Sequence, residues 1–356
     1  MWLSKYFFTF HMSLLLLMTA LISHAQGSSS AVIMQYHNVS TQTPRSTSVT
    51  PTEVSKHMAW LKENGFTILP LPTLIESLQN KTEFESNKVV AITFDDTNKS
   101  VCEIAWPILK KENIPFTLFI NSDPIEKKYS SQCTWQQLNE MMQSGLLTAA
   151  NHSHTHINMT TKPANISQLA WLNKMQQEIT LAQTLIEKNI EGAVEQSTQL
   201  FAYPYGEYNT EIAKLVTKLG YIGFGQHSGA VGFQSDFSAL PRFPISSQYA
   251  NLETLKVKLL SLAFPGEFII DAENPIEISS KHNPPILKIK VSDSKILNRT
   301  ICYNSKGEKI SSEIDGDTLI VQALEKLEKG RHRYTCTSPS AISGRYYWGS
   351  HQWLIE

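Results

Sequence analysis

The sequence predicts an α/β domain followed by a small all-β domain, and two observations lead to this prediction. From residue 31 onward, short apolar segments alternate with segments of helical periodicity. This alternation is typical of parallel strands joined by crossover helices, in a barrel or in a doubly wound sheet. After about residue 264, proline-rich breaks separate short runs in which apolar and polar residues alternate, which indicates the antiparallel strands of a sandwich.

The individual elements follow from the same patterns. In the first domain the expected strands are residues 31–36, 89–94, 116–120, 147–150, 200–203 and 221–225. The expected helices are residues 51–64, 100–112, 134–144, 167–188 and 210–219. In the second domain the expected strands include residues 286–292, 317–324 and 331–337. Tyr334 precedes Cys336 by two residues, which is the spacing of a tyrosine corner, so an immunoglobulin-like sandwich is one form that this domain could take.

The first 25 residues differ from the rest of the chain. Lys5 precedes an apolar run over residues 6–22, and the small residues Ser23 and Ala25 follow it. This pattern predicts a secretory signal peptide cleaved near Ala25, although an uncleaved membrane anchor would look similar. We therefore expect an exported protein, periplasmic or extracellular. The expected divisions of the chain are a signal peptide at residues 1–25, the α/β domain at residues 26–267 and the all-β domain at residues 268–356.

Export changes how the four cysteines are interpreted, because disulfides persist in oxidising compartments. Cys102 and Cys133 lie in the first domain, and Cys302 and Cys336 lie in the second. Pairing within each domain is the simplest of the three possible connectivities. Unpaired buried thiols are the alternative.

Composition limits the partners. The formal net charge is -1, and 18% of the residues are charged, so nothing indicates electrostatic capture of nucleic acid. After the first 25 residues, no stretch is long and apolar enough to cross a bilayer. We expect a mature protein without a membrane span that recognises its partner through a local site.

Polar side chains follow five of the expected strands. They are His37, the Asp95–Asp96 pair, the segment NHSHTH at 151–156, the segment PYG at 204–206, and His227. Because the carboxyl ends of parallel strands share one face of the fold, these groups should converge there.

Two of these segments predict a metal centre. His152 and His156 are four residues apart and could bind one transition-metal ion if the segment turns helically. A carboxylate from the Asp95–Asp96 pair would supply a third ligand and leave positions open for water, as in hydrolytic sites. The alternatives are a solvated loop for the histidines and a helix N-cap for the aspartates.

At this point the chain resembles a known family. The segments TFDD, NHSHTH and FAYPYG are similar, in order, to the first three motifs of the polysaccharide deacetylases with a NodB homology domain (carbohydrate esterase family 4). The exported poly-β-1,6-N-acetylglucosamine deacetylases are the most similar group, and the resemblance spans roughly residues 30 to 250.

The resemblance implies a distorted (β/α) barrel and a set of roles. Asp96, His152 and His156 would hold a divalent metal, and Asp95 would be the general base. In the third motif the backbone N–H of Tyr205 would stabilise the oxyanion. Pro204, Tyr205 and His37 would contact the substrate. His154 falls on a variable position of the second motif and is expected to lie outside the ligand set.

The chain departs from the family pattern at two positions. Thr97 replaces a usual glycine, so the loop after Asp96 should bend differently, and Ala202 replaces an arginine that many members have. Without that arginine another residue should hold Asp95, and Arg242 in the segment LPRFP is our candidate, against a surface role.

A general acid must protonate the leaving amine, and two histidines are candidates. His227 and His37 both follow predicted strands. We favour His227 over His37, and a buried structural histidine is the alternative for either residue.

These observations predict a hydrolase acting on a carbon–nitrogen bond, a metal-dependent enzyme that removes N-acetyl groups from a polysaccharide containing N-acetylglucosamine. An O-acetyl polysaccharide esterase and a carbohydrate-binding protein that has lost turnover are the alternatives. Zinc is the default metal for two histidines and one aspartate, and Co²⁺, Ni²⁺ or Mn²⁺ would fit similar ligands.

Overall fold

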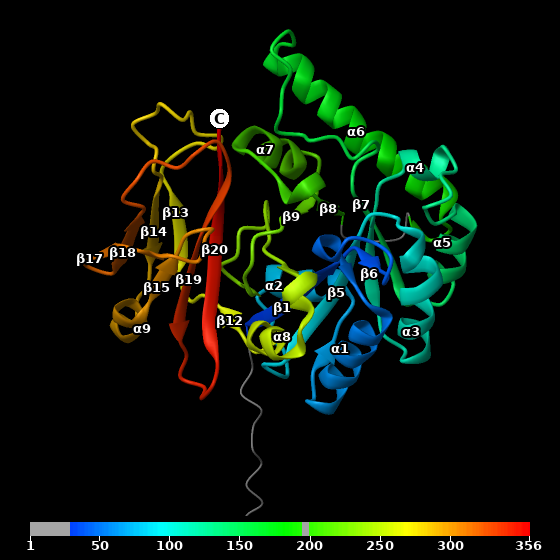
Figure 1. Ribbon diagram of the computed structural model, residues 1–356, viewed down its shortest axis with the longest axis horizontal. Coiled ribbons are helices and arrows are strands. Elements are labelled where there is room, and N and C mark those ends of the chain that lie inside the picture. Colours follow the sequence, from blue (N-terminus) through cyan, green and yellow to red (C-terminus); the bar gives the residue numbers. More distant parts are fainter. Residues whose placement is uncertain (1–28, 194–198) are drawn as a thin grey trace, which may run out of the picture.

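The computed structural model describes residues 29–193 and 199–356 (Figure 1). The predicted signal peptide, residues 1–25, lies outside the described residues. Among the helices within those ranges, none is long and apolar enough to span a membrane.

A nine-stranded sheet forms the centre of the first domain, in the order β10-β1-β5-β6-β7-β8-β9, with β11 beside β1 and β4 beside β5. The six principal strands pair in parallel and are β1 (Ser30–Tyr36), β5 (Val89–Asp95), β6 (Phe116–Ile120), β7 (Leu147–Asn151), β8 (Leu200–Ala202) and β9 (Ile222–Phe224). The short strands are β4 (Thr67–Ile68), β10 (Val231–Gly232) and β11 (Phe243–Pro244), and β2 (Asn38–Val39) pairs separately with β3 (Ser48–Val49). All six strands expected from the sequence are present, with ends within one residue of the predicted ones.

Both faces of this sheet are buried. In β1, Val32 and Met34 pack in one hydrophobic cluster, while Ala31 and Ile33 pack in another. This explains why the strands are nearly continuous apolar runs instead of alternating ones.

Helices surround the strands (Figure 1). They are α1 (Pro51–Glu63), α2 (Leu71–Gln79), α3 (Trp106–Lys111), α4 (Asp123–Glu126), α5 (Trp135–Met142), α6 (Gln168–Asn189), α7 (Thr210–Lys218) and α8 (Leu252–Leu259). Helices α1 and α5 begin with capping boxes, formed by Thr50 with Glu53 and by Thr134 with Gln137, which satisfy the first free N–H groups of each helix. The helix expected at residues 100–112 begins as a π-helix, Val101–Ala105, before α3.

One segment connects the two sides of the curved sheet. Leu240 forms a bridge to Phe224 in β9, and Phe243 and Pro244 in β11 pair with β1. The first domain is therefore an α/β half-barrel, consistent with the distorted barrel that the sequence implied.

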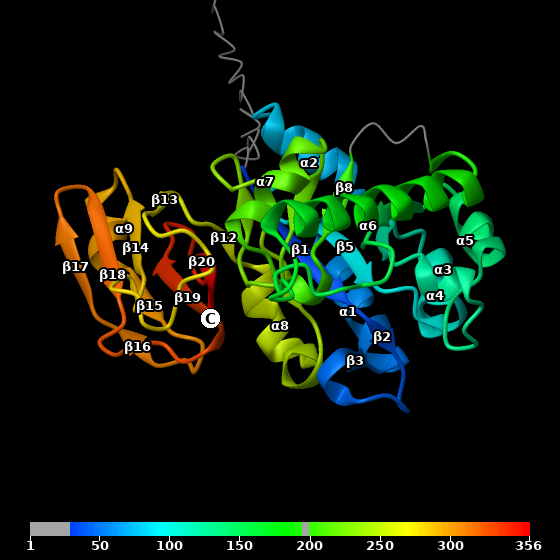
Figure 2. The ribbon, with the colours of Figure 1, turned by 90° about the horizontal axis from the view of Figure 1, so that it is seen from above.

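The C-terminal region consists of two sheets that stand beside the half-barrel (Figure 2). One has the order β12-β20-β19-β15-β16 and the other the order β13-β14-β18-β17. Their bounds are β12 (Leu262–Ala263), β13 (Glu267–Ile270), β14 (Ile286–Lys290), β15 (Ile301–Tyr303), β16 (Lys309–Ile310), β17 (Ser312–Asp315), β18 (Thr318–Gln322), β19 (Gly330–Pro339) and β20 (Tyr346–Ile355), with α9 (Ser294–Arg299) between β14 and β15. Leu287 and Val321 from one sheet share a buried core with Tyr334 and Trp353 from the other.

The immunoglobulin-like form of this region stays a prediction. The Tyr334 hydroxyl donates to the carbonyl of Pro285 and accepts the N–H of Ala323, so it does anchor neighbouring backbone. However, Cys302 and Cys336 are directly opposite each other on β15 and β19 of one sheet, whereas the conserved disulfide of antibody domains joins two sheets. The division at residues 267 and 268 also stays a prediction, and strand β12, which precedes it, already pairs with β20.

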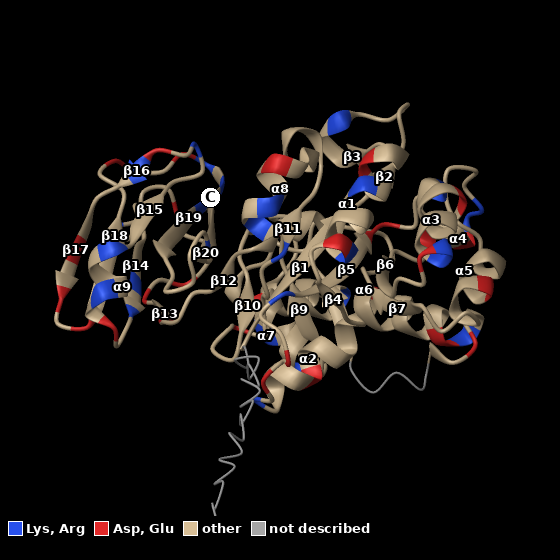
Figure 3. Ribbon diagram, turned by 90° about the horizontal axis from the view of Figure 1, so that it is seen from below, with Lys and Arg blue, Asp and Glu red and all other residues tan. Residues whose placement is uncertain are grey.

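Charged residues of both signs are interspersed over the elements of both domains (Figure 3). This distribution agrees with the formal net charge of -1. Recognition through one strongly charged face is therefore not indicated.

The two predicted disulfides, Cys102–Cys133 and Cys302–Cys336, are confirmed. We expect the Cys102→Ala/Cys133→Ala variant to lose about 3–4 kcal/mol of unfolding free energy, because the bond closes a loop between residues 31 positions apart and so restricts the unfolded chain. Urea unfolding of the variant, with the reduced wild type beside it, measures this loss. A loss below about 1 kcal/mol in the variant would contradict the expectation.

Candidate metal centre

The carboxyl ends of the parallel strands bring four of the predicted groups to one edge of the half-barrel. Asp95 is the last residue of β5, His152 directly follows β7, and Tyr205 lies just beyond β8. His37 directly follows β1 and interacts electrostatically with both Asp95 and His156. Convergence of strand ends therefore creates a polar site at this edge.

Asp96, His152 and His156 form a cluster that could hold a metal ion, with one potential ligand atom from each residue within 4.8 Å of the others. The Asp96 Oδ1 lies 3.8 Å from the His152 Nε2 and 3.6 Å from the His156 Nε2. Asp96 and His156 both have positive φ, 66° and 56°, so two tight backbone turns aim these side chains at one point.

The surroundings of the two histidines suit metal binding. His152 is 1% exposed, and its Nδ1 lies 2.7 Å from the carbonyl oxygen of Ala202. A hydrogen bond from Nδ1 leaves the lone pair of Nε2 free for a metal, and such a partner also fixes the ring. Burial, together with the nearby His152, lowers the pKa of His156 to about 4, so this imidazole is neutral and can act as a ligand at neutral pH.

Asp95 is fully buried beside this cluster but is not one of the residues that form it. Arg242 donates to both of its oxygens, Nη1 to Oδ1 at 2.6 Å and Nη2 to Oδ2 at 2.7 Å, and Gln35 donates to Oδ2 at 2.5 Å. Burial alone would raise the pKa of the Asp95 carboxyl, but Arg242, with smaller contributions from neighbours such as His152, holds this pKa well below its usual range. Asp95 is therefore an ionised carboxylate in a fixed orientation.

Arg242 itself is held by the protein. Its Nε donates to the carbonyl of Gly225 at 3.0 Å, and its guanidinium lies 5.1 Å from the ring centroid of Phe119, a cation–π distance. The side chain is 0% exposed. It is placed beside Asp95 in a chain that has Ala202 where an arginine was expected.

Two further sequence expectations concern the loops around the cluster. Thr97 is buried, and its N–H and hydroxyl both donate to the side-chain oxygen of Asn121, so hydrogen bonds fix the loop where a glycine is usual. His154 lies away from the metal cluster, with Nδ1 hydrogen-bonded to Ser122 and Nε2 3.6 Å from Asp123.

The segment PYG lies beside the metal cluster. Tyr205 has φ 60°, its side chain is half exposed, and its ring centroid is 4.6 Å from that of His156. Two residues of the C-terminal sheets donate hydrogen bonds to this segment. Arg331 in β19 donates to the carbonyl of Tyr205, and the Nε2 of Gln352 in β20 donates to the carbonyl of Gly206 at 3.1 Å.

His227 occupies a different place from the one its position after β9 suggested. It is 4% exposed and lines a cavity between the half-barrel and the C-terminal sheets. Burial lowers the pKa of His227 to about 3, and no contact with Asp96, His152 or His156 is found among the described residues. Of the two general-acid candidates, His37 is the one near the metal cluster.

Three residues that contact Asp95 or the PYG segment were not predicted from the sequence: Gln35, Arg331 and Gln352. Gln35 had a signal, because it is the polar residue in the otherwise apolar run AVIMQY of β1. Arg331 and Gln352 had none, because their contacts depend on how the C-terminal sheets pack on the half-barrel.

Comparison with known proteins agrees with this geometry. The sequence profile described as polysaccharide deacetylase matches residues 83–223. The Bacillus subtilis protein YxkH, which carries the name of a polysaccharide deacetylase, is 31% identical over 216 residues, covering 60% of this chain and 71% of YxkH. The chain belongs to the polysaccharide deacetylase family. Among other members of this family, a poly-β-1,6-N-acetyl-D-glucosamine N-deacetylase of Staphylococcus aureus is 27% identical over 243 residues, covering 61% of this chain and 79% of its own.

Solved structures of other proteins share the fold. The deacetylase PplD of Streptococcus pyogenes, solved with acetate, has a TM-score of 0.56 and 24% identity, covering 65% of this chain and 98% of its own. IcaB from Ammonifex degensii has a TM-score of 0.56 and 23% identity, covering 67% of this chain and 99% of its own. At these identities the likeness shows a common polysaccharide deacetylase fold and leaves the substrate of this member open.

Proposed function

We propose that this polysaccharide deacetylase is a metal-dependent enzyme that removes N-acetyl groups from a polysaccharide containing N-acetylglucosamine. One observation carries the proposal: a buried, ionised Asp95 lies directly beside the Asp96–His152–His156 cluster. A protein that only bound carbohydrate would gain nothing from a fixed general base next to a metal site. The named activity of the Staphylococcus aureus relative supports the choice of N-acetylglucosamine.

We propose zinc as the metal, held by Asp96, His152 and His156, with Co²⁺, Ni²⁺ or Mn²⁺ as other ions that the same donors accept. When bound, the ion would polarise the acetyl carbonyl and make a water molecule more acidic.

The chain's own residues would handle the protons. Asp95 takes a proton from the attacking water. Arg242 and Gln35 hold its carboxylate in one orientation for this transfer. His37 donates a proton to the leaving amine, since it is the candidate acid that interacts with Asp95 and His156. Tyr205 offers its backbone N–H to the oxyanion, and His37, Pro204 and Tyr205 contact the sugar.

We also propose that the enzyme acts outside the cytoplasm, in the periplasm or the extracellular space. Both disulfides support this, because such bonds persist in oxidising compartments. The signal peptide at residues 1–25 is part of the same proposal.

Acetate release tests the proposed function. We expect the protein to release acetate from N-acetylglucosamine oligomers, to lose this activity with a chelator and to regain it when Zn²⁺, Co²⁺, Ni²⁺ or Mn²⁺ is added. An O-acetylated oligosaccharide is assayed in parallel. Release from that substrate alone would indicate an esterase. Stoichiometric metal binding without release from either substrate would indicate a binding protein and overturn the proposal.

The hydrogen bonds between the C-terminal sheet and the PYG segment lead to a further prediction. Gln352 is 2% exposed, and Gln352→Leu removes its hydrogen bond to Gly206, so we expect kcat to fall about 10-fold through loss of alignment of Tyr205 while metal affinity is unchanged. Gln322→Leu is a matched control, because Gln322 makes the same kind of bond to Pro284 within the C-terminal sheets. Equal kcat values for the two variants would contradict the prediction.

A further inference from the structure

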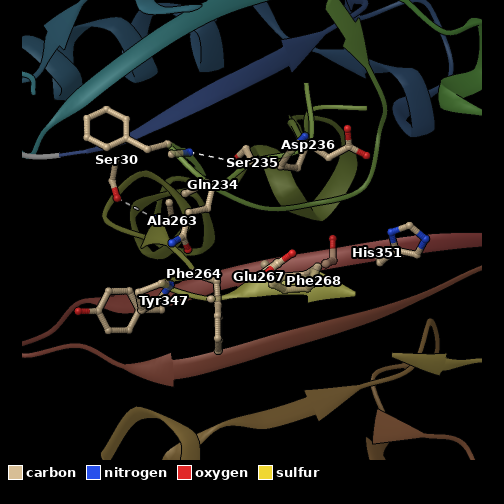
Figure 4. Close-up of a pocket in the computed structure, with 18 of the residues that line it drawn as sticks. Ser30, Gln234, Ser235, Asp236, Ala263, Phe264, Glu267, Phe268, Tyr347 and His351 are labelled. Atoms are coloured by element: carbon tan, nitrogen blue, oxygen red, sulfur yellow. Dashed lines mark hydrogen bonds between the residues drawn. The ribbon is translucent and has the colours of Figure 1, made fainter. Parts of the chain in front are cut away.

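A cleft separate from the metal centre runs between the half-barrel and the C-terminal sheets (Figure 4). One part, the first cavity, has a volume of about 590 Å³ and lies between the segment around Asp236 and strand β20. A second cavity of about 600 Å³ shares Tyr208, Asp236 and His351 with the first, so the two adjoin. Asp96, His152 and His156 line neither of them.

Aromatic rings form part of the cleft wall. The ring centroid of Phe264 lies 5.8 Å from that of Phe268 and 6.4 Å from that of Tyr347, and all three residues line the first cavity. Aromatic surfaces combined with a few polar groups are typical of pockets for small ligands, and sugar rings bind through both their apolar faces and their hydroxyls.

Carboxylates outnumber cations along the cleft. In the first cavity Asp236 and Glu267 are the acidic lining residues, and neither lysine nor arginine lines it among the described residues. Both carboxylate residues are exposed. The second cavity adds Glu273 and Asp271, which is already paired with Lys288, against Lys214 and Lys218. The charge of the first cavity therefore favours a cationic ligand.

A buried histidine lies at the same place. His227 lines the first cavity, and its buried Nδ1 has no hydrogen-bond partner among the described residues, although buried polar atoms are usually paired. Arg333, Arg242 and Arg331 act on His227 without lining the cavity, so a cationic group would bind at the carboxylates and not at His227.

We propose that this cleft is a second glycan site, which binds the amine-bearing polysaccharide that deacetylation produces. The inference rests on the proposed function in one respect: removing an acetyl group from N-acetylglucosamine exposes a primary amine, which is cationic at neutral pH. Two adjoining cavities suit several sugar units of a polymer. Holding the modified strand here would keep the enzyme on its polymer between successive reactions.

Direct binding of a glucosamine tetramer to the full-length protein, measured by calorimetry, tests the proposal. We expect the glucosamine tetramer to bind more tightly than the N-acetylglucosamine tetramer, and Asp236→Asn/Glu267→Gln to weaken its binding about fivefold, the effect of removing two exposed ion pairs. Asn retains the side-chain oxygen that accepts the N–H of Ser238, and the thermal midpoint of the variant checks that it folds.

Two comparisons make the result specific. Glu313→Gln, an exposed carboxylate on β17, should bind the glucosamine tetramer as the wild type does, and Tyr205→Ala tests whether the tetramer occupies the metal centre instead. Unchanged binding in the Asp236→Asn/Glu267→Gln variant, or loss only in Tyr205→Ala, would overturn the proposal. Binding requires no turnover, so failure of acetate release and failure of the cleft to bind glucosamine are separate outcomes.

Discussion

Asp95→Asn is expected to lower acetate release by about 10²- to 10⁴-fold, the usual contribution of a general base. Asparagine has nearly the same shape as aspartate and keeps an oxygen facing Arg242, but it cannot take a proton from water. The proposed metal ligands Asp96, His152 and His156 are untouched, so the variant should bind its ion with the wild-type stoichiometry. Metal content and acetate release, measured on the same sample, check both parts.

The controls for Asp95→Asn separate chemistry from folding. The substitution leaves the Arg242 cation buried without its counter-charge, so turnover must be measured well below the thermal midpoint of the variant. Asp315→Asn, an exposed aspartate on β17, should be as active as the wild type. A metal-loaded Asp95→Asn protein with wild-type kcat would exclude Asp95 as the base.

Sequence patterns predicted those site residues whose place depends on their position at the end of a strand. Asp95, Asp96, His152 and Tyr205 each follow or end a buried strand, and the topology of a parallel sheet alone brings strand ends together. The polysaccharide deacetylase motifs then separated the candidate metal ligand Asp96 from the candidate base Asp95, which composition and spacing could not do.

Contacts between distant segments were predicted only where a residue that the motif usually contains was missing. Arg242 lies 147 residues from Asp95 along the chain, and it was proposed because Ala202 left the carboxylate without a partner. No missing motif residue pointed to Arg331 or Gln352. The place of His227 was not predicted, because a residue after β9 can turn toward the C-terminal sheets as well as toward the metal edge, and its role as the acid stays a prediction.

Arg242→Met is expected to lower the unfolding free energy by about 3–5 kcal/mol, because it leaves the fully buried Asp95 carboxylate without a charged partner. Gln35 alone remains as a side-chain donor to Asp95 among the described hydrogen bonds. Acetate release should fall as well, since the base loses the guanidinium that fixes its orientation. Denaturant unfolding and acetate assays measure the two effects.

The exposed pair between Arg45 and Glu53 is a matched control for this prediction. It is also bidentate, at 2.9 and 2.8 Å, but the Arg45 side chain is 44% exposed, so Arg45→Met should cost at most about 1 kcal/mol. In the double variant Arg242→Met/Asp95→Asn neither charge remains buried, so stability should recover relative to Arg242→Met while activity stays low. If Arg242→Met were no more costly than Arg45→Met, the buried pair would not be what holds Asp95. A double variant at least as stable as the wild type, and inactive, would show that this polysaccharide deacetylase retains a buried charge pair for its reaction and not for its stability.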